Sequence, residues 1–210
     1  MKKIATAVTL GAGVVVLAAC AAMQSAPRDR ALALMERDFH PVGIAGMDRL
    51  KEDAVTAACN KYNDNPPADV AKKLQAQQYA AIKWPADGKL MGDWKVGEKI
   101  AQRGRGMTWR DKPGKTSRGE DNGGGCYNCH QIGPDTDSFG TIGPSLYQFA
   151  KLRGYGADIQ RYAYAKIYNA KAYSVCSQMP RFGHVDALEE DQIQDLVALL
   201  MDPKSPVNSR

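Results

Sequence analysis

Cys126-Tyr127-Asn128-Cys129-His130 is the stretch that decides how this chain is organised. A C-x-x-C-H run is the attachment signal for a c-type haem: the two thiols join the haem vinyl groups, and the histidine becomes an axial ligand of the iron. The alternatives are a redox C-x-x-C pair, half of a zinc site or a chance match. A redox pair is expected in a βαβ setting, which is missing, and zinc needs a second ligand pair at finger-like spacing. The motif therefore predicts one covalently bound haem c, with His130 on its iron.

The N-terminus has the pattern of a bacterial export signal. Lys2 and Lys3 precede an uncharged run over residues 4–17, and small residues follow. The run is too short to be a permanent membrane span. Leu17-Ala18-Ala19-Cys20 resembles a lipobox, in which Cys20 becomes the lipid-modified first residue, while cleavage at an A-x-A site is the alternative. We expect a signal peptide over residues 1–19. The mature protein is expected in the periplasm, either free or tethered by a lipid anchor.

Composition limits the partners. The net charge falls from +5 to +3 when Lys2 and Lys3 leave with the signal, and this is no signature of a nucleic-acid-binding protein. No other segment is long and apolar enough to cross a membrane. We therefore expect no nucleic-acid partner, and membrane contact only through a lipid anchor. About 190 residues remain, enough for one domain and an extension.

Two cysteines are left over from the lipobox and the haem motif. Cys59 and Cys176 would both lie in an oxidising compartment. Parity favours a disulfide between them, which would tie the N-terminal extension to the haem domain and restrict the unfolded chain by about 4 kcal/mol. Two free buried thiols, or a bridge to a partner chain, are the alternatives.

Residues 20–91 are expected to form a partly helical extension. Asp48 can cap a helix that runs to about Tyr62 and contains Cys59. A second helix is expected from about Pro67 to Trp84. Both are too weakly apolar to form a core, so we expect them to lie against the haem domain or another subunit. His40 is interpreted as a loop histidine.

Residues 92–202 have the pattern of an all-α, class I cytochrome c domain, and residues 203–210 form a tail. Asp93 can cap the first helix, in which Gly97 would allow another helix to cross closely. The last helix is expected over residues 188–201, with acidic residues in its first turn and Pro203 as its stop. First and last helices of this kind cross in small cytochromes c.

The second axial ligand is expected downstream of the motif. Met179 is the best candidate, because Pro180 keeps it in a loop from which a thioether can reach the iron opposite His130. His184 is the rival ligand and Cys176 a third possibility. Met201 lies on the last helix and is expected in the core.

Pro144 is expected to form a hydrogen bond with the first ligand, His130. Its carbonyl can accept the Nδ1 hydrogen of His130 and so fix the tautomer. The plainer interpretation puts Pro144 at the first position of a helix that ends near Gly154, and both can hold. With His130 and Met179 on the iron, both axial positions are filled, which predicts electron transfer rather than oxygen or peroxide binding.

Five stretches together resemble one family. The sequence over residues 92–109, the haem motif, and the sequences over residues 139–146, 179–183 and 202–208 are similar to those of SoxX, the monohaem subunit of the SoxAX cytochromes of bacterial thiosulfate oxidation. The resemblance runs from about Met35 to Asn208. It implies thioether bonds at Cys126 and Cys129 and axial ligation by His130 and Met179; the interpretation of Cys20 rests on the lipobox alone.

The resemblance also implies a division of labour. A SoxA-like haem subunit would be the site where thiosulfate is joined oxidatively to a cysteine of a SoxYZ-like carrier. The SoxX-like chain would collect the electrons and pass them to a soluble cytochrome c. It would then be the non-catalytic, electron-transfer subunit of an L-cysteine S-thiosulfotransferase, with no catalytic residue of its own. A free-standing periplasmic electron carrier is the alternative, and the extension favours the docked subunit because it offers interface.

Overall fold

The computed structural model describes residues 27, 29–43, 45–106, 108, 110–134, 136 and 138–209. The chain divides into two compact units, Met1–Pro41 with Gly46–Lys51, and Val42–Ala45 with Glu52–Arg210. The described residues form helices and three isolated β-bridges but no strand, so the all-α expectation is confirmed. Within these ranges no helix combines the length and apolarity that crossing a bilayer requires. The signal peptide and Cys20 lie outside the described residues.

The first unit contains a helix over residues 29–38 and the short 3-10 helix η1 (Met47–Leu50). Asp48 lies inside η1, where its carbonyl accepts a hydrogen bond from the Lys51 backbone. The chain is extended at Lys51, so the predicted helix cannot start at Asp48. That prediction was wrong.

In the second unit, α2 (Ala54–Lys61) is capped by Asp53, five residues after Asp48, and the Asp53 carboxylate accepts the Thr56 N–H at 2.7 Å. α3 (Ala68–Ala80) begins after Pro67 as expected but ends four residues before Trp84. Leaving the helix allows Trp84 to stack on Tyr164, with ring centroids 5.5 Å apart.

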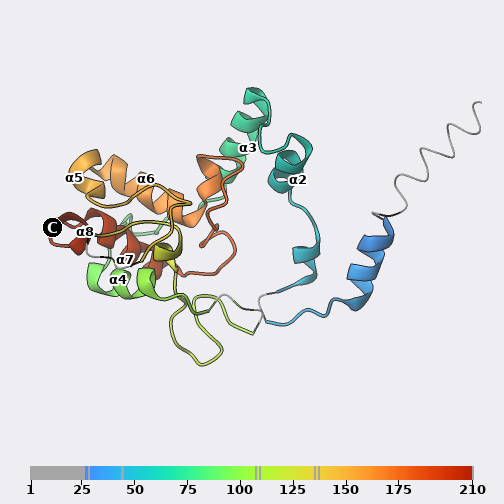
Figure 1. Cartoon of the computed structure of the whole chain (residues 1–210), viewed down its shortest axis with the longest axis horizontal. Helices are drawn as coiled ribbons and strands as arrows, with labels where there is room; N and C mark the ends of the chain where they lie inside the picture. The colour runs from blue at the N-terminus through green and yellow to red at the C-terminus, as the bar shows by residue number, and fades with distance from the viewer. Residues whose placement is uncertain are drawn as a thin grey trace, which may run out of the picture. The chain divides into compact units, whose positions relative to one another are not determined.

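The second unit is built on the crossing of α4 (Trp94–Gln102) and α7 (Glu190–Met201), which lie against each other in Figure 1. Asp93 caps α4 by accepting the Lys95 N–H at 2.8 Å. A Cβ on Gly97 would lie 2.1 Å from the Asp195 carbonyl oxygen, so the backbones meet where only glycine fits. The predicted cap, close crossing and final helix are confirmed.

Helix α6 (Ala157–Tyr168) packs on α7 as well, and it was not predicted from the sequence. Its buried side chains are Ala163, Tyr164, Ala165, Ile167 and Tyr168. They join residues of α4 and α7, including the buried Met201, in the main cluster, the larger of the two groups of buried apolar side chains. The small cluster consists of Val55, Cys59, Leu74 and Val175.

Short helices complete the second unit: α5 (Phe149–Arg153), η3 (Ala170–Ala172) and α8 (Pro206–Ser209). Pro144 does not start a helix, because Gln148 has left-handed backbone (φ 55°) and α5 begins only after it. The plainer interpretation of Pro144 was wrong. The tail is part of the fold, since the buried Asn208 amide accepts from the Ala150 N–H at 3.1 Å and donates to the Leu200 carbonyl at 2.9 Å.

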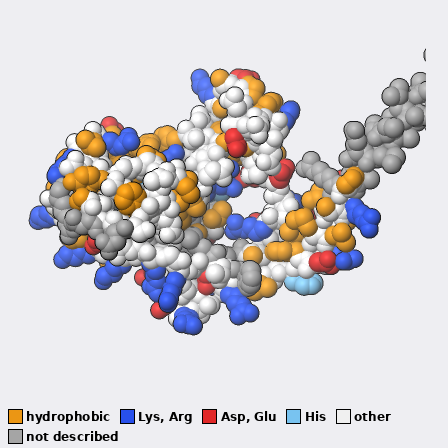
Figure 2. Space-filling view, in the orientation of Figure 1, with side chains coloured by type: hydrophobic (Ala, Val, Ile, Leu, Met, Phe, Trp, Pro, Cys, Tyr) orange, Lys and Arg blue, Asp and Glu red, His pale blue; other side chains and the backbone are white. Residues whose placement is uncertain are grey.

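The predicted boundary at residue 91 does not separate two compact units, because residues 52–91 belong to the same unit as the domain that follows. Asn169 Nδ2 donates to Gln78 Oε1 at 3.0 Å, and the Tyr164 hydroxyl donates to the Lys83 carbonyl at 3.2 Å. In Figure 2, Lys and Arg side chains are spread around the edge of this unit rather than gathered at one point. Residues 52–91, which include α2 and α3, therefore lie against the haem-motif domain, as one of the two expectations had it.

Candidate functional site

The glycines before the motif hold it against the end of α4. The N–H of Gly124 donates to the Ile100 carbonyl at 2.8 Å, and the N–H of Gly125 donates to the Arg103 carbonyl at 2.9 Å. A Cβ on Gly123 would lie 1.8 Å from the Arg103 oxygen, and Gly125 has φ 56°. Side chains would prevent this close approach, so the glycine run fixes where Cys126 begins.

The motif itself forms one tight turn. Cys126–Asn128 is the 3-10 helix η2, and the Cys126 carbonyl accepts from the N–H groups of Cys129 and His130 at 3.1 and 2.9 Å. Both cysteines are free thiols. Cys126 packs against the main cluster, and burial of its thiol raises its pKa from 9.0 to about 12. A redox C-x-x-C pair needs a lowered thiol pKa, so the environment of Cys126 argues against that alternative.

His130 is fixed from two sides. Its Nδ1 lies 2.7 Å from the Pro144 carbonyl oxygen, which is the contact expected from the sequence. Because a carbonyl can only accept, Nδ1 carries the hydrogen, and in the neutral imidazole this tautomer leaves the lone pair on Nε2. The ring also rests on Gly143, where a Cβ would lie 2.1 Å from Cε1. The imidazole is thus oriented with one ligand atom to offer.

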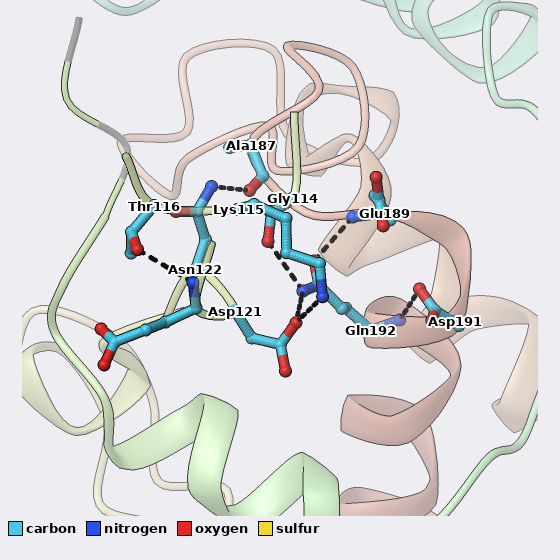
Figure 3. A network of polar contacts seen from close by, with 10 residues as sticks. Gly114, Lys115, Thr116, Asp121, Asn122, Ala187, Glu189, Asp191 and Gln192 are labelled. Atoms are coloured by element: carbon cyan, nitrogen blue, oxygen red, sulfur yellow. Dashed lines mark hydrogen bonds and ion pairs between the residues drawn. The ribbon is translucent and has the colours of Figure 1, made fainter. Parts of the chain in front are cut away.

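A polar network holds the chain before the motif against the start of α7 (Figure 3). The Gly114 carbonyl accepts from the Asn122 N–H and from Gln192 Nε2, each at 2.9 Å. The fully buried Asn122 donates its side-chain N–H to the Ala187 carbonyl at 2.9 Å. Lys115 pairs with Asp121 beside this network. Sequence reasoning missed these residues, because an Asn or Gln that satisfies distant backbone atoms leaves no local pattern.

Met179, the expected second ligand, is half-buried and packs against the same main cluster as Cys126. Its N–H donates to the Ser177 hydroxyl at 3.2 Å. The rival His184 has an exposed side chain. An apolar setting suits a thioether ligand, so this difference favours Met179. The third candidate, Cys176, was wrong, because its sulfur is already bonded to Cys59.

The Cys59–Cys176 disulfide is present, with an Sγ–Sγ distance of 2.05 Å, so the predicted pairing is confirmed. The alternatives of two free thiols and of a bridge to another chain are thereby excluded. A carboxylate oxygen of Asp64 lies within 4.8 Å of both sulfurs. Asn63 and Asp64 have left-handed backbone (φ 49° and 60°), which these residue types tolerate. The Asn-Asp pair after α2 was a readable turn signal for this position.

A pocket of about 310 Å³ opens beside the disulfide. Asp64, Gln75, Tyr173 and Cys176 are among its lining residues, whereas the partner sulfur belongs to Cys59, which is only 6% exposed. With the disulfide intact the two sulfurs are not thiolates and cannot ligate a metal as such.

The donor set at the motif suits covalent haem. It offers two unlinked thiols on one turn, an oriented imidazole with Nε2 to donate, and an adjoining apolar cluster. Zinc would need further ligands there. Among the described residues, the cluster of potential metal ligands lies instead at Cys59, Asp64 and Cys176.

No protein-family model matches the chain. The chain is 37% identical over 161 residues to a protein of Aquifex aeolicus (strain VF5) described as an uncharacterized lipoprotein, across 75% of this chain and 73% of that protein. The chain belongs to the family of this lipoprotein.

Proposed function

We propose that this chain is an exported monohaem c-type cytochrome that transfers electrons as the SoxX-like subunit of a SoxAX-type complex. Haem c would be attached at Cys126 and Cys129, with His130 and Met179 on its iron. The observation that carries the proposal is the 2.7 Å contact between His130 Nδ1 and the Pro144 carbonyl. It gives an imidazole next to two free thiols the tautomer and orientation of an iron ligand.

A bound haem c would supply one-electron transfer at its iron. Cys126 and Cys129 would hold it by two thioether bonds. The Pro144 carbonyl would make the His130 imidazole a stronger donor by accepting its Nδ1 hydrogen. Met179 would supply a thioether ligand, which would favour the reduced iron. With His130 and Met179 both holding the iron, the group would transfer electrons rather than bind oxygen or peroxide.

In the SoxAX-type scheme, electrons are released when thiosulfate is conjugated to a cysteine of a SoxYZ-like carrier. This chain would accept them from a SoxA-like haem subunit and pass them to a soluble cytochrome c. It would be the non-catalytic subunit of an L-cysteine S-thiosulfotransferase. The basis is the resemblance of residues 92–109, 139–146, 179–183 and 202–208 to SoxX.

A free-standing periplasmic electron carrier is the second candidate, and one observation favours it. Residues 52–91 pack into the same compact unit as the haem-motif domain and are bonded to it through Cys59. The extension thus has a role within this chain, and a partner is not needed to explain it.

We also propose that Cys20 carries a lipid anchor and that the protein is held at a periplasmic membrane surface. The lipobox-like Leu17-Ala18-Ala19-Cys20 supports this, as does the description of the Aquifex relative as a lipoprotein. Replacing Cys20 by Ser would then release the protein into the soluble fraction after export, whereas a Cys20→Ser protein that stays with the membrane would contradict the anchor.

The function is tested by isolating the tagged chain from its native host and staining for covalent haem. We expect haem in the wild type, none in a Cys126→Ser/Cys129→Ser variant, and haem retained in a matched Cys59→Ser/Cys176→Ser variant. A copurifying haem subunit, with haem reduction that requires thiosulfate and the carrier protein, supports the SoxAX-type role. A lone monohaem protein indifferent to thiosulfate leaves the free-standing carrier, and a chain without haem overturns both.

The ligand assignment is tested by Met179→Ala against His184→Ala. We expect Met179→Ala to lower the midpoint potential and to let carbon monoxide bind the reduced iron. His184→Ala should leave both properties unchanged. The reverse pattern would give the ligand role to His184.

A further inference from the structure

The segment that carries Met179 is held at two points by α2. Three residues before Met179, Cys176 is bonded to Cys59 in the middle of α2. Two residues after it, Arg181 Nη2 lies 2.7 Å from Asp53 Oδ2 at the start of α2. The residue expected on the iron therefore lies between two attachments to one helix of the extension.

The second attachment is itself well fixed. Asp53 also accepts the N–H of Thr56, so its carboxylate is oriented by the helix that it caps. The Arg181 side chain is only 18% exposed, and its Nη1 lies 3.3 Å from Gln78 Oε1 on α3. Removing the Asp53 carboxylate would leave this partly buried guanidinium with Gln78 as its remaining side-chain acceptor.

Apolar packing around α2 is limited, so these attachments matter. The small cluster has four buried residues, and two of them, Val55 and Leu74, are aliphatic side chains of α2 and α3. Burial of each contributes about 1.5–3 kcal/mol, which is comparable to the entropy lost by ordering a few residues. The disulfide is the one covalent tie between α2 and the Met179 segment among the described residues.

We propose that α2 is a clamp that positions Met179, and that reduction of the Cys59–Cys176 disulfide by a low-molecular-weight thiol releases this methionine from the iron. The proposal rests on the proposed function, because it concerns the ligand of that same site. Asp53, Cys59, Cys176 and Arg181 are positioning residues. The disulfide then makes the ligand set, and with it the potential, depend on the thiols of the surroundings.

The pocket decides which sulfur is attacked. Cys176 lines the pocket, whereas Cys59 is buried. A small thiolate would attack Cys176 Sγ, form a mixed disulfide there and expel Cys59 as a thiolate that takes up a proton. A second thiol would attack the mixed disulfide and free Cys176. In total two external thiols lose two electrons and become a disulfide, and Cys59 and Cys176 become two thiols.

The clamp is tested first by hydrogen exchange, which needs no bound group. In a Cys59→Ala/Cys176→Ala variant we expect hydrogen exchange over residues 174–183 to become at least about tenfold faster. Loss of the disulfide should raise the population of the locally opened segment by about that factor. Exchange over residues 190–201 of α7 should not change. Asp53→Asn keeps a capping oxygen and removes the ion pair, so it should show a smaller increase at the same residues. Asp93→Asn, at the cap of α4, is the matched control.

The consequence for the ligand is tested on the haem-loaded protein reduced with ascorbate, which leaves protein disulfides intact. We expect carbon monoxide to bind the Cys59→Ala/Cys176→Ala variant about tenfold faster than wild type, and the methionine–iron charge-transfer band of the oxidised variant to weaken. Wild type treated with a small thiol and then freed of it should behave like the variant.

The outcomes separate the two proposals. A chain without haem overturns the proposed function and the ligand control together. A haem-loaded variant with unchanged exchange, unchanged carbon monoxide binding and an unchanged methionine band overturns the clamp alone. Faster exchange with an unaltered band overturns the redox control, because Met179 would then stay on the iron without the disulfide.

Discussion

The main cluster and the small cluster hold their helices in different ways. α4 and α7 meet backbone to backbone at Gly97, over a broad apolar core. α2 and α3 contribute three of the four buried residues of the small cluster, and they depend on a disulfide and the Asp53–Arg181 ion pair. Where buried apolar area is large, shape alone determines the contact, and where it is small, specific bonds must supply what packing does not.

The strongest way to break this comparison is to fill the α4–α7 crossing. Gly97→Val would place carbon atoms where the Asp195 backbone lies. We expect a loss of about 3 kcal/mol or more of unfolding free energy, or failure to fold, because backbone cannot move aside as a side chain can. Urea unfolding followed by circular dichroism measures it. Gly104→Ala is the control, since the nearest atom to its Cβ is 3.8 Å away; equal losses at both glycines would mean that the crossing is not special.

Removing the disulfide tests the other region. For Cys59→Ala/Cys176→Ala, whose two cysteines lie 117 positions apart, we expect a loss of about 2–4 kcal/mol of unfolding free energy. The protein should keep its helical spectrum, because α4, α6 and α7 do not depend on this bond. Thermal unfolding with and without a reducing agent is the measurement: reductant should destabilise wild type and leave the variant unchanged. A variant as stable as wild type would show that the small cluster holds α2 unaided.

A smaller effect is expected at the ion pair, and pH reveals it. Burial of Asp53 acts to raise its pKa, but hydrogen bonds from Thr56 and the Arg181 guanidinium outweigh burial and lower the pKa from 3.8 to about 2. A lowered carboxyl pKa stabilises the fold above 3.8, and this contribution is lost as the pH falls through about 2.

Asp53→Asn should therefore cost less than about 1 kcal/mol at neutral pH, since the carboxylate is partly exposed. Its stability should also fall less steeply than that of wild type between pH 4 and pH 2. Asp93→Asn, which makes the same change at the cap of α4, is again the matched control. If the stabilities of wild type and Asp53→Asn fall equally steeply between pH 4 and pH 2, the ion pair contributes nothing to the free energy of unfolding.

Local patterns in the sequence were enough for much of the site. The C-x-x-C-H run, the cap at Asp93, the crossing at Gly97 and the partner of His130 all follow from residues close together in the chain. Cys59 and Cys176 could be paired because few cysteines remained. Asp48 was mistaken for a cap because several residues nearby could start a helix, and the long-range contacts of the chain determined which one did. Helix α6 was missed because its alanines and tyrosines form no clear apolar stripe, although the folded core buries them.

The sequence by itself determined the chemistry that the chain can offer: two thiols and an imidazole in five residues, a methionine before a proline, and a glycine at position 97 where another helix can cross closely. Only the tertiary structure decided that α2 holds the segment of Met179 on both sides, that Asp64 lies beside the disulfide, and that Asn122 and Gln192 connect the loop before the motif to α7. The physical reason is how far apart in the sequence the contacting residues lie. Residue type and spacing fix local geometry, whereas these contacts join residues 65 to 128 positions apart and exist only once the whole core has formed.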